Sequence, residues 1–172
     1  MKNAKLLILL FIVFLLKFET TQAQMFKFKA IFIYNFTKYI DWTSEYKNGD
    51  FVFGVLGNSP IIEELQISLS KKKITNQKIV VKKFSSVYNI KKCHVLYIPS
   101  RQSGQLKAVL TALSGKPTLI VGDKKDMTIY GADINFLTIE RGIKYEISKK
   151  KIAGKGLKVS QKLIDLGINV DN

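Results

Sequence analysis

Cys93 and His94 are the chain's one cysteine and one histidine, and they are neighbours at the entrance of an expected strand. Successive side chains of a strand point to opposite faces, so within that strand the pair is unable to hold one metal ion or to form a thiolate–imidazole dyad. We interpret them as a buried thiol and a hydrogen-bonded imidazole, since cysteine is among the most buried residue types. With one cysteine no intrachain disulfide forms, whereas an intermolecular disulfide stays open.

The stretch "GVLGNSP" (54–60) joins an expected strand to an expected helix and carries two glycines, as a phosphate-binding loop would. It lacks both the G-x-G-x-x-G spacing and the G-K-[ST] ending. The helix that follows opens with Glu63 and Glu64, which repel an anion. The stretch is therefore better explained as a plain turn between a strand and a helix.

Asp123 follows the apolar run "TLIVG" and so lies at the carboxyl end of an expected strand. Proteins of the α/β class place ligands at such strand ends. Residues that follow other strands meet there, so we expect a ligand crevice formed by Asn58, Ser59, Ser100, Arg101 and Asp123. A receptor for small molecules would use this crevice. A hydrolase built on Asp123 and Asp133 is a further alternative, without support from their spacing of ten positions.

The sequence holds no Ser/His/Asp order, no metal-ligand cluster and no dinucleotide fingerprint. We therefore expect no enzyme, no catalytic residue, no bound metal and no cofactor. The missing catalytic motifs favour a binding role.

Four short apolar runs, bounded by turn residues, predict the strands that carry these positions. They cover residues 51–57, 78–84, 94–100 and 117–123. Because they are in places continuous rather than alternating, they are typical of strands covered on both faces. Helical patterns lie between them: one begins at Ser59-Pro60, and another spans 103–115 and stops at a Gly-Lys-Pro sequence.

The last third predicts a hairpin and a closing helix. Residues 133–148 form two arms around Glu140-Arg141-Gly142, where glycine supplies the positive φ of the turn. Residues 156–167 place Val159, Leu163 and Leu166 on one helical face. The expected fold is a single-domain α/β sandwich, with a mixed central sheet flanked by helices.

Residues 1–23 have the pattern of a secretory signal peptide: two early lysines, an apolar run of 11 residues at 6–16, and a small-residue site ending at Ala23. The run is about half the roughly 20 residues that a membrane-spanning helix needs. We expect cleavage near Ala23, a periplasmic location, a domain over 24–172 and no stable membrane insertion afterwards.

The chain is strongly basic, with 28 Lys and Arg against 13 Asp and Glu, a formal charge of +15. Removal of residues 1–23 would take away three lysines and one glutamate and leave +13. The lysines are spread over separate turns, and arginine occurs twice, at Arg101 and Arg141. Arginine is the residue that binds bases and phosphates in a bidentate way, so nucleic acid is not the expected partner. We interpret the lysines as a solvated surface. A charge of this size also favours attraction to acidic surfaces such as phospholipid, lipopolysaccharide or an acidic protein.

The aromatic stretch "KAIFIYNFTKYIDW" (29–42) has three alternatives: a membrane-seeking helix, a base-stacking surface or a core helix. A helical wheel favours the core helix, with Phe28, Phe32, Ile33, Phe36, Tyr39 and Ile40 on one buried stripe and Lys27, Thr37, Lys38 and Asp41 opposite. Lys29 falls inside the stripe and is expected to extend outward. Ile31, Tyr34, Asn35 and Trp42 lie off the stripe, and we expect a partner protein to bind there.

Three blocks of the chain resemble the YfiR family of exported bacterial regulators. They are "KAIFIYNFTKYIDWTSE" (29–45), "CHVLYIPS" (93–100) and the segment 119–167. The last block is the most specific: it contains Gly122-Asp123, then Gly131 ahead of Ile134-Asn135-Phe136, then a closing Gly-Leu-x-x-Ser-x-x-Leu. The resemblance covers essentially all of the chain after the signal segment.

The resemblance implies a periplasmic α/β protein without catalysis. The family's best-known member represses a membrane-bound diguanylate cyclase through that enzyme's periplasmic sensor region, which lowers cyclic di-GMP. By this analogy the partner would be the periplasmic domain of a membrane-bound sensor or cyclase, and a homodimer stays open. Two departures concern cysteine and glycine: the family often carries further cysteines, and here Gly131-Ala132-Asp133 stands where paired glycines are usual.

Overall fold

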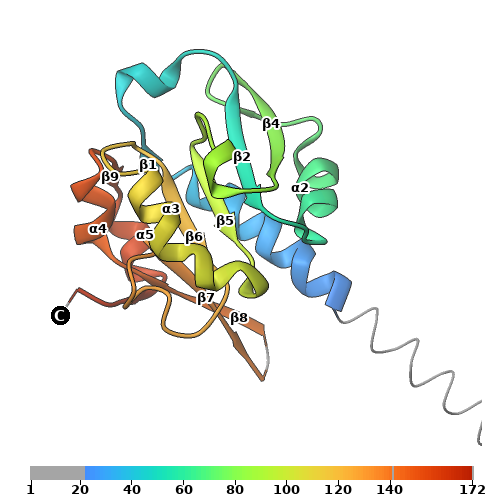
Figure 1. Ribbon diagram of the computed structural model, residues 1–172, viewed down its shortest axis with the longest axis vertical. Helices are drawn as coiled ribbons and strands as arrows, with labels where there is room; N and C mark the ends of the chain where they lie inside the picture. Colours follow the sequence, from blue (N-terminus) through green and yellow to red (C-terminus); the bar gives the residue numbers. More distant parts are fainter. Residues whose placement is uncertain (1–21, 141, 172) are drawn as a thin grey trace, which may run out of the picture.

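The computed structural model describes residues 22–140 and 142–171 (Figure 1). The first element is a helix over residues 22–36, here called the N-terminal helix. Residues 1–21 of the predicted signal segment lie outside the described residues. Among the residues described, no helix combines the length and the apolar character needed to cross a membrane.

A mixed sheet of eight strands forms the centre of the molecule, in the order β10-β8-β7-β6-β5-β2-β4-β3. Its strands are β2 (Phe51–Leu56), β3 (Lys73–Ile74), β4 (Gln77–Phe84), β5 (Val95–Ile98), β6 (Leu119–Gly122), β7 (Ile134–Ile139), β8 (Gly142–Ile147) and β10 (Ile168–Asn169). Five neighbouring strands, β4, β2, β5, β6 and β7, run parallel to one another. Strand β8 is antiparallel to β7, and β3 is antiparallel to β4. A separate small sheet pairs β1 (Ile40–Asp41) with β9 (Lys158–Val159).

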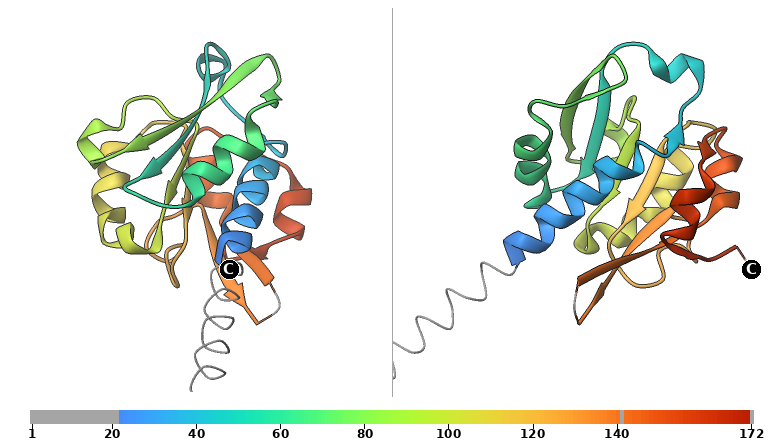
Figure 2. Two further views of the ribbon diagram at one scale, coloured as in Figure 1. Left: turned by 90° about the vertical axis from the view of Figure 1, so that its right-hand side faces the viewer. Right: turned by 180° about the vertical axis from the view of Figure 1, so that it is seen from behind.

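Helices cover both faces of the main sheet (Figure 2). The α-helices after the first are α2 (Ile61–Leu69), α3 (Leu106–Ala112), α4 (Lys149–Gly154) and α5 (Gln161–Asp165). Short 3-10 helices are η1 (Ser44–Lys47), η2 (Val87–Asn89) and η3 (Ser100–Gln105). The N-terminal helix, α2, α4 and α5 contribute to one core, whereas η2 and α3 contribute to the core on the other face. The α/β sandwich with a mixed central sheet is therefore confirmed.

The alternation of side chains along the strands explains the two cores. In β5, Val95 and Tyr97 belong to the first core, and Leu96 and Ile98 belong to the second. Because both faces are covered, every residue of β5 is buried, and the sequence of such a strand is continuously apolar. The four strands predicted from apolar runs are all present, and so is the hairpin of β7 and β8, with Gly142 at φ 138°.

The predicted closing helix over 156–167 is wrong. Residues 158–159 form strand β9, and the helix that follows is the short α5, beyond which Leu166 is 64% exposed. Pairing with β1 extends the backbone: the Ser160 N–H donates to the Tyr39 carbonyl at 2.8 Å. The helix α4 was not predicted, although Ser148 caps it by accepting the Lys151 N–H at 3.1 Å.

The N-terminal helix is a core helix, as predicted, and Ile33, Phe36 and Ile40 of the predicted stripe are buried, but the rest of the stripe differs. Ala30, Ile33 and Phe36 are fully buried, as is usual for i, i+3 and i+6 positions on one face. Phe28, predicted to be buried, is 43% exposed, while Lys29, predicted to extend outward, is 7% exposed. Thr37, predicted on the wet face, is buried as well, and its hydroxyl donates to the Tyr34 carbonyl at 2.6 Å.

Candidate functional site

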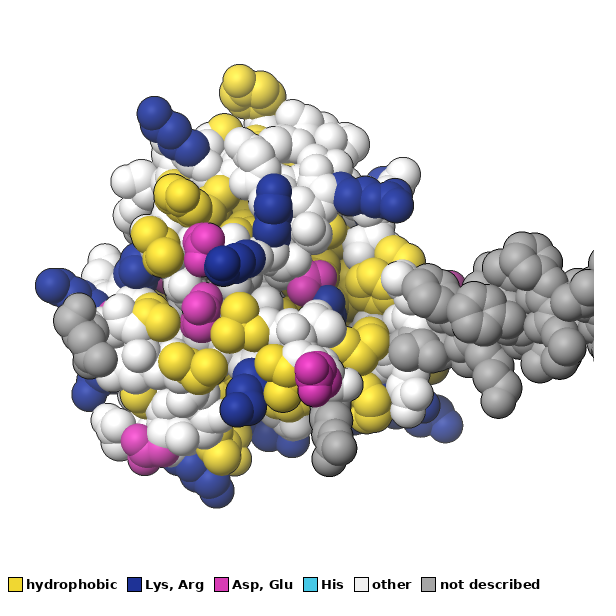
Figure 3. All heavy atoms as spheres, turned by 90° about the horizontal axis from the view of Figure 1, so that it is seen from below, with side chains coloured by type: hydrophobic (Ala, Val, Ile, Leu, Met, Phe, Trp, Pro, Cys, Tyr) yellow, Lys and Arg dark blue, Asp and Glu magenta, His cyan; other side chains and the backbone are white. Residues whose placement is uncertain are grey.

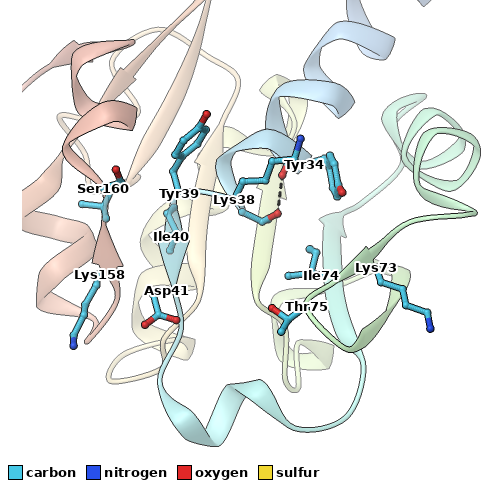
Figure 4. Close-up of a pocket in the computed structure, with 12 residues that line it drawn as sticks. Tyr34, Lys38, Tyr39, Ile40, Asp41, Lys73, Ile74, Thr75, Lys158 and Ser160 are labelled. Carbon is cyan, nitrogen blue, oxygen red and sulfur yellow. Dashed lines mark hydrogen bonds between the residues drawn. The ribbon is translucent and has the colours of Figure 1, made fainter.

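The aromatic segment that ends the N-terminal helix and continues into β1 forms one wall of an open groove. This lysine groove has a volume of about 610 Å³ and is lined by residues 34, 37–41, 73–75 and 158–160. Figure 4 shows that β1 lies between β9 on one side and the β3 turn on the other, with Tyr34 and Lys38 above. Segments from three parts of the chain therefore meet at this groove.

Positive charge dominates the lysine groove. Lys38, Lys73 and Lys158 line it, and the one lining carboxylate, Asp41, pairs with the Lys47 ammonium at 2.8 Å. The Tyr34 ring is flanked by two ammonium groups, those of Lys38 and Lys72, at 4.8 and 4.4 Å from its centroid. The groove thus offers an aromatic ring among lysines, which suits an acidic partner surface.

A second, mostly apolar groove lies on the other flank of the same segment. This aromatic groove, of about 440 Å³, is lined by residues 32, 35, 36, 38, 39, 143–145, 163 and 166. Phe36 and Tyr145 form its base, with ring centroids 4.9 Å apart. Burial raises the pKa of Tyr145 to about 12, and its hydroxyl donates to the Leu163 carbonyl.

The four residues predicted to bind a partner do not lie together. Tyr34 lines the lysine groove and Asn35 lines the aromatic groove, while Ile31 is half-buried and lines neither. Trp42 is 6% exposed, so the prediction that it lies on an uncovered flank is wrong. Its ring is edge-on to Phe51 at 5.0 Å, because the chain turns into β1 after the helix and carries Trp42 into the core. Sequence analysis also missed Lys73 and Lys158, which no local pattern connects to the helix.

The five residues predicted to form a ligand crevice do lie together. A cavity of about 230 Å³ is lined by residues 22, 26, 58–60, 99–101 and 123, at the carboxyl ends of β2, β5 and β6. The chain leaves β2 toward β4 on one side and later adds β5 and β6 on the other, so this is the switch point of the sheet. Ligand binding in this crevice stays a prediction.

A buried ion pair involves Asp123, one of the residues that line the crevice. The Lys29 ammonium donates to both carboxylate oxygens of Asp123, at 2.6 and 2.8 Å, and the Tyr97 hydroxyl donates to the same carboxylate. Burial, followed by the charge of Asp123, raises the pKa of Tyr97. Lys29 and Tyr97 were not identified from the sequence, although a lysine on a buried helical face needs an acidic partner.

Figure 3 shows the lower face of the molecule, on which acidic and basic side chains are interspersed among small apolar groups. No group of three or more His, Cys, Asp or Glu side chains among the described residues is placed to hold a metal ion.

Cys93 and His94 are structural, as predicted. Both are fully buried, and burial raises the pKa of the Cys93 thiol to about 12. A thiol of this kind is unreactive, which argues against the intermolecular disulfide that the sequence left open. The His94 ring accepts the Val52 N–H at Nδ1 (3.0 Å), and its Nε2 lies 2.7 Å from the Tyr46 carbonyl, to which it donates.

Acid is expected to destabilise the protein through His94. Burial lowers the pKa of His94 below its ordinary value of 6.5, so the folded protein binds its proton less readily than the unfolded chain does. The contribution of neutral His94 to the free energy of unfolding is therefore fully present at neutral pH. It is lost as the pH falls below about 6.5, by at most about 1.4 kcal/mol per pH unit. Urea unfolding between about pH 7.5 and about pH 5.5 measures this slope. His94→Asn should be less stable at neutral pH and should have a flatter slope; an equal slope would contradict the assignment.

A family model described as YfiR/HmsC-like matches residues 26–168. None of the curated proteins matches the chain. The matched range contains the lysine groove and, apart from Gln22, the crevice.

Proposed function

The chain belongs to the YfiR/HmsC-like family, and on that premise we propose that it is a non-enzymatic regulatory protein of the periplasm. It binds the sensor region of a membrane-bound signalling protein and represses it. The partner we expect is of the diguanylate cyclase type, so that binding lowers cyclic di-GMP. A homodimer, and cleavage near Ala23, stay predictions.

The observation that carries this proposal is the lysine groove. Segment 29–45, which resembles the family near the N-terminal end, is only partly buried in the core. Its Tyr34 and Lys38 line an open groove together with Lys73 and Lys158. Aromatic residues surrounded by polar side chains are typical of protein interfaces, in which tyrosine is a frequent hot spot.

The charge of the groove defines the partner surface. Because the lining lysines outnumber the one paired carboxylate, we expect an acidic surface on the sensor region. Association should then be faster at low salt and should slow as ionic strength rises, since exposed charges are screened over about 8 Å at physiological salt.

Tyr34→Ser is expected to weaken binding to the sensor region about tenfold, which corresponds to about 1.4 kcal/mol. The change removes the ring that two lysines flank. Because the half-buried Tyr34 side chain also packs against the first core, urea unfolding of the variant checks that it is folded before binding is measured. Binding is measured by titration of the partner's purified periplasmic region. Tyr88→Ser is the matched control, because Tyr88 is 95% exposed, does not line the groove and lies in η2, which contributes to the core on the other face of the sheet.

The partner is identified by photo-crosslinking in cells, with the crosslinker at position 73 in the groove and, as control, at position 88. A membrane protein with a periplasmic sensor domain crosslinked at position 73 alone supports the proposal. Equal crosslinking at both positions, or equal loss of binding in Tyr34→Ser and Tyr88→Ser, would place the interface elsewhere.

A second candidate function is a sensory module that binds a small molecule in the crevice. It is favoured by the meeting of Asn58, Ser59, Ser100, Arg101 and Asp123 at the switch point of the sheet, where α/β proteins bind ligands. The two candidates are compatible, because the crevice and the lysine groove lie at opposite ends of the N-terminal helix: residues 22 and 26 line the crevice, and residue 34 lines the groove.

A further inference from the structure

Several polar side chains of the crevice have hydrogen-bond donors that are free to bind a ligand. Asn58 uses its amide oxygen to accept from the Lys83 ammonium at 2.8 Å, which leaves its NH₂ group as a donor. The Ser59 hydroxyl oxygen accepts the Ile61 N–H at 3.4 Å, so its proton is free to donate. Ser100 adds a second hydroxyl at the mouth of the crevice.

Arg101 brings a full positive charge to the same lining. Its guanidinium is a donor only, with five N–H groups in a planar fork that matches a carboxylate or a phosphate. The side chain is exposed, and no ion pair within 4.0 Å joins it to another described residue. It is therefore available to a ligand.

The acceptor of the crevice is already satisfied. Asp123 receives both of its charged hydrogen bonds from Lys29 and a third from Tyr97. The pair is almost fully buried, with side-chain exposures of 9% and 11%, which makes exchange of Lys29 for a ligand amine costly. A cationic ligand thus finds no free carboxylate among the residues lining the crevice.

From this donor set we propose that the crevice binds a small anion, a carboxylate or phosphate group carried on a compact apolar body. The anionic group meets Arg101, Ser59 and Ser100, and the body packs on Phe26, Pro60 and Pro99. The volume of about 230 Å³ includes Gln22 in its lining, a residue that cleavage near Ala23 would remove, and it suits a ligand of the size of one aromatic acid rather than a nucleotide. The inference rests on the second candidate function and is independent of the partner that binds the lysine groove.

Two glutamates lie near enough to be considered against an anion. Glu63 and Glu64 belong to the first turn of α2, but neither lines the crevice, and Glu63 is exposed to solvent. The Lys83 ammonium, which has the opposite charge, donates to the lining residue Asn58. The local balance therefore favours an anion.

The test is an NMR titration of the exported protein with three probes that share a phenyl body: benzoate, phenyl phosphate and the neutral benzamide. Benzoate or phenyl phosphate should shift the amide signals of residues 58, 59, 100, 101 and 123 in a saturable way. Arg101→Gln should weaken this binding by about tenfold or more, since hydrogen bonds to charged groups are the strong ones. The probe that binds with the higher affinity then shows whether the crevice prefers a carboxylate or a phosphate group.

Lys150→Gln is the matched control, because it removes the same charge from an exposed position in α4, and it should leave the affinity within about twofold. Equal shifts with benzamide would overturn the anionic ligand and keep the crevice as a binding site. No shift with any probe would overturn both this inference and the second candidate function. Shifts scattered over lysine-rich surfaces and unchanged in Arg101→Gln would mean an adventitious ion only, which overturns the inference as well.

Discussion

Replacing Trp42 with Ala is expected to lower the free energy of unfolding by about 3 to 5 kcal/mol, the usual cost of truncating a buried Trp. The indole is 6% exposed and lies against Phe51 and His94, with centroids at 5.0 and 6.0 Å. Truncation leaves a cavity at the point where the chain passes from the N-terminal helix into β1. Urea unfolding of the purified protein measures the loss.

Trp42→Phe separates packing from hydrogen bonding. The Trp42 Nε1 has no hydrogen-bond partner among the described residues, so replacing the indole breaks no hydrogen bond with them. Phe keeps most of the apolar contact, and we expect a loss well below that of Trp42→Ala. If Trp42→Ala unfolded at the same urea concentration as the wild type, Trp42 would be a surface residue and would return to the predicted partner-binding flank.

Replacing Lys29 with Met is expected to lower the free energy of unfolding by about 3 kcal/mol or more, because it leaves the Asp123 carboxylate buried without its counter-charge. The pair joins the N-terminal helix to the end of β6 across 94 positions of sequence. Losing it should also free the helix end that lines the crevice. Urea unfolding measures the stability, and amide exchange over residues 26–30 measures the loosening of the helix.

The double variant Lys29→Met/Asp123→Asn tests the cause. With no charge left to bury, it should be more stable than Lys29→Met alone, which is the signature of coupled sites in a double-mutant cycle. Lys47→Met is the matched control: its pair with Asp41 is 55% and 58% exposed, and such pairs contribute about 0 to 1 kcal/mol. Equal losses in Lys29→Met and Lys47→Met would contradict the importance of burial.

Continuous apolar runs predicted the buried strands correctly. Every position of a strand covered on both faces is buried and is usually apolar. The strands β2, β5 and β6 can therefore be recognised from their continuous apolar sequences. The hairpin of β7 and β8 was equally visible, because Gly142 adopts a φ that other residues avoid. The two-residue strands β1, β3, β9 and β10 were missed, since two residues are too few for any periodicity.

The two sets of predicted site residues differed in how well they could be placed. In the crevice, each residue follows a parallel strand, and the carboxyl ends of neighbouring parallel strands meet at one edge. That rule is enough to bring Asn58, Ser100 and Asp123 together. On the N-terminal helix the prediction relied on a wheel that extended past the end of the helix at residue 36, so Trp42 was placed on a face that does not exist.

By itself, the sequence determined the α/β class, the buried strands, the crevice residues and the resemblance to the family, because these depend on patterns within short segments. Only the tertiary structure decided that Lys29 is buried, that Trp42 is in the core and that residues near 34, 73 and 158 share one groove. The physical reason is long-range pairing. A lysine side chain extends into water unless a buried carboxylate can pair with it. Here that carboxylate belongs to Asp123, which follows β6 and lies 94 positions away in the sequence.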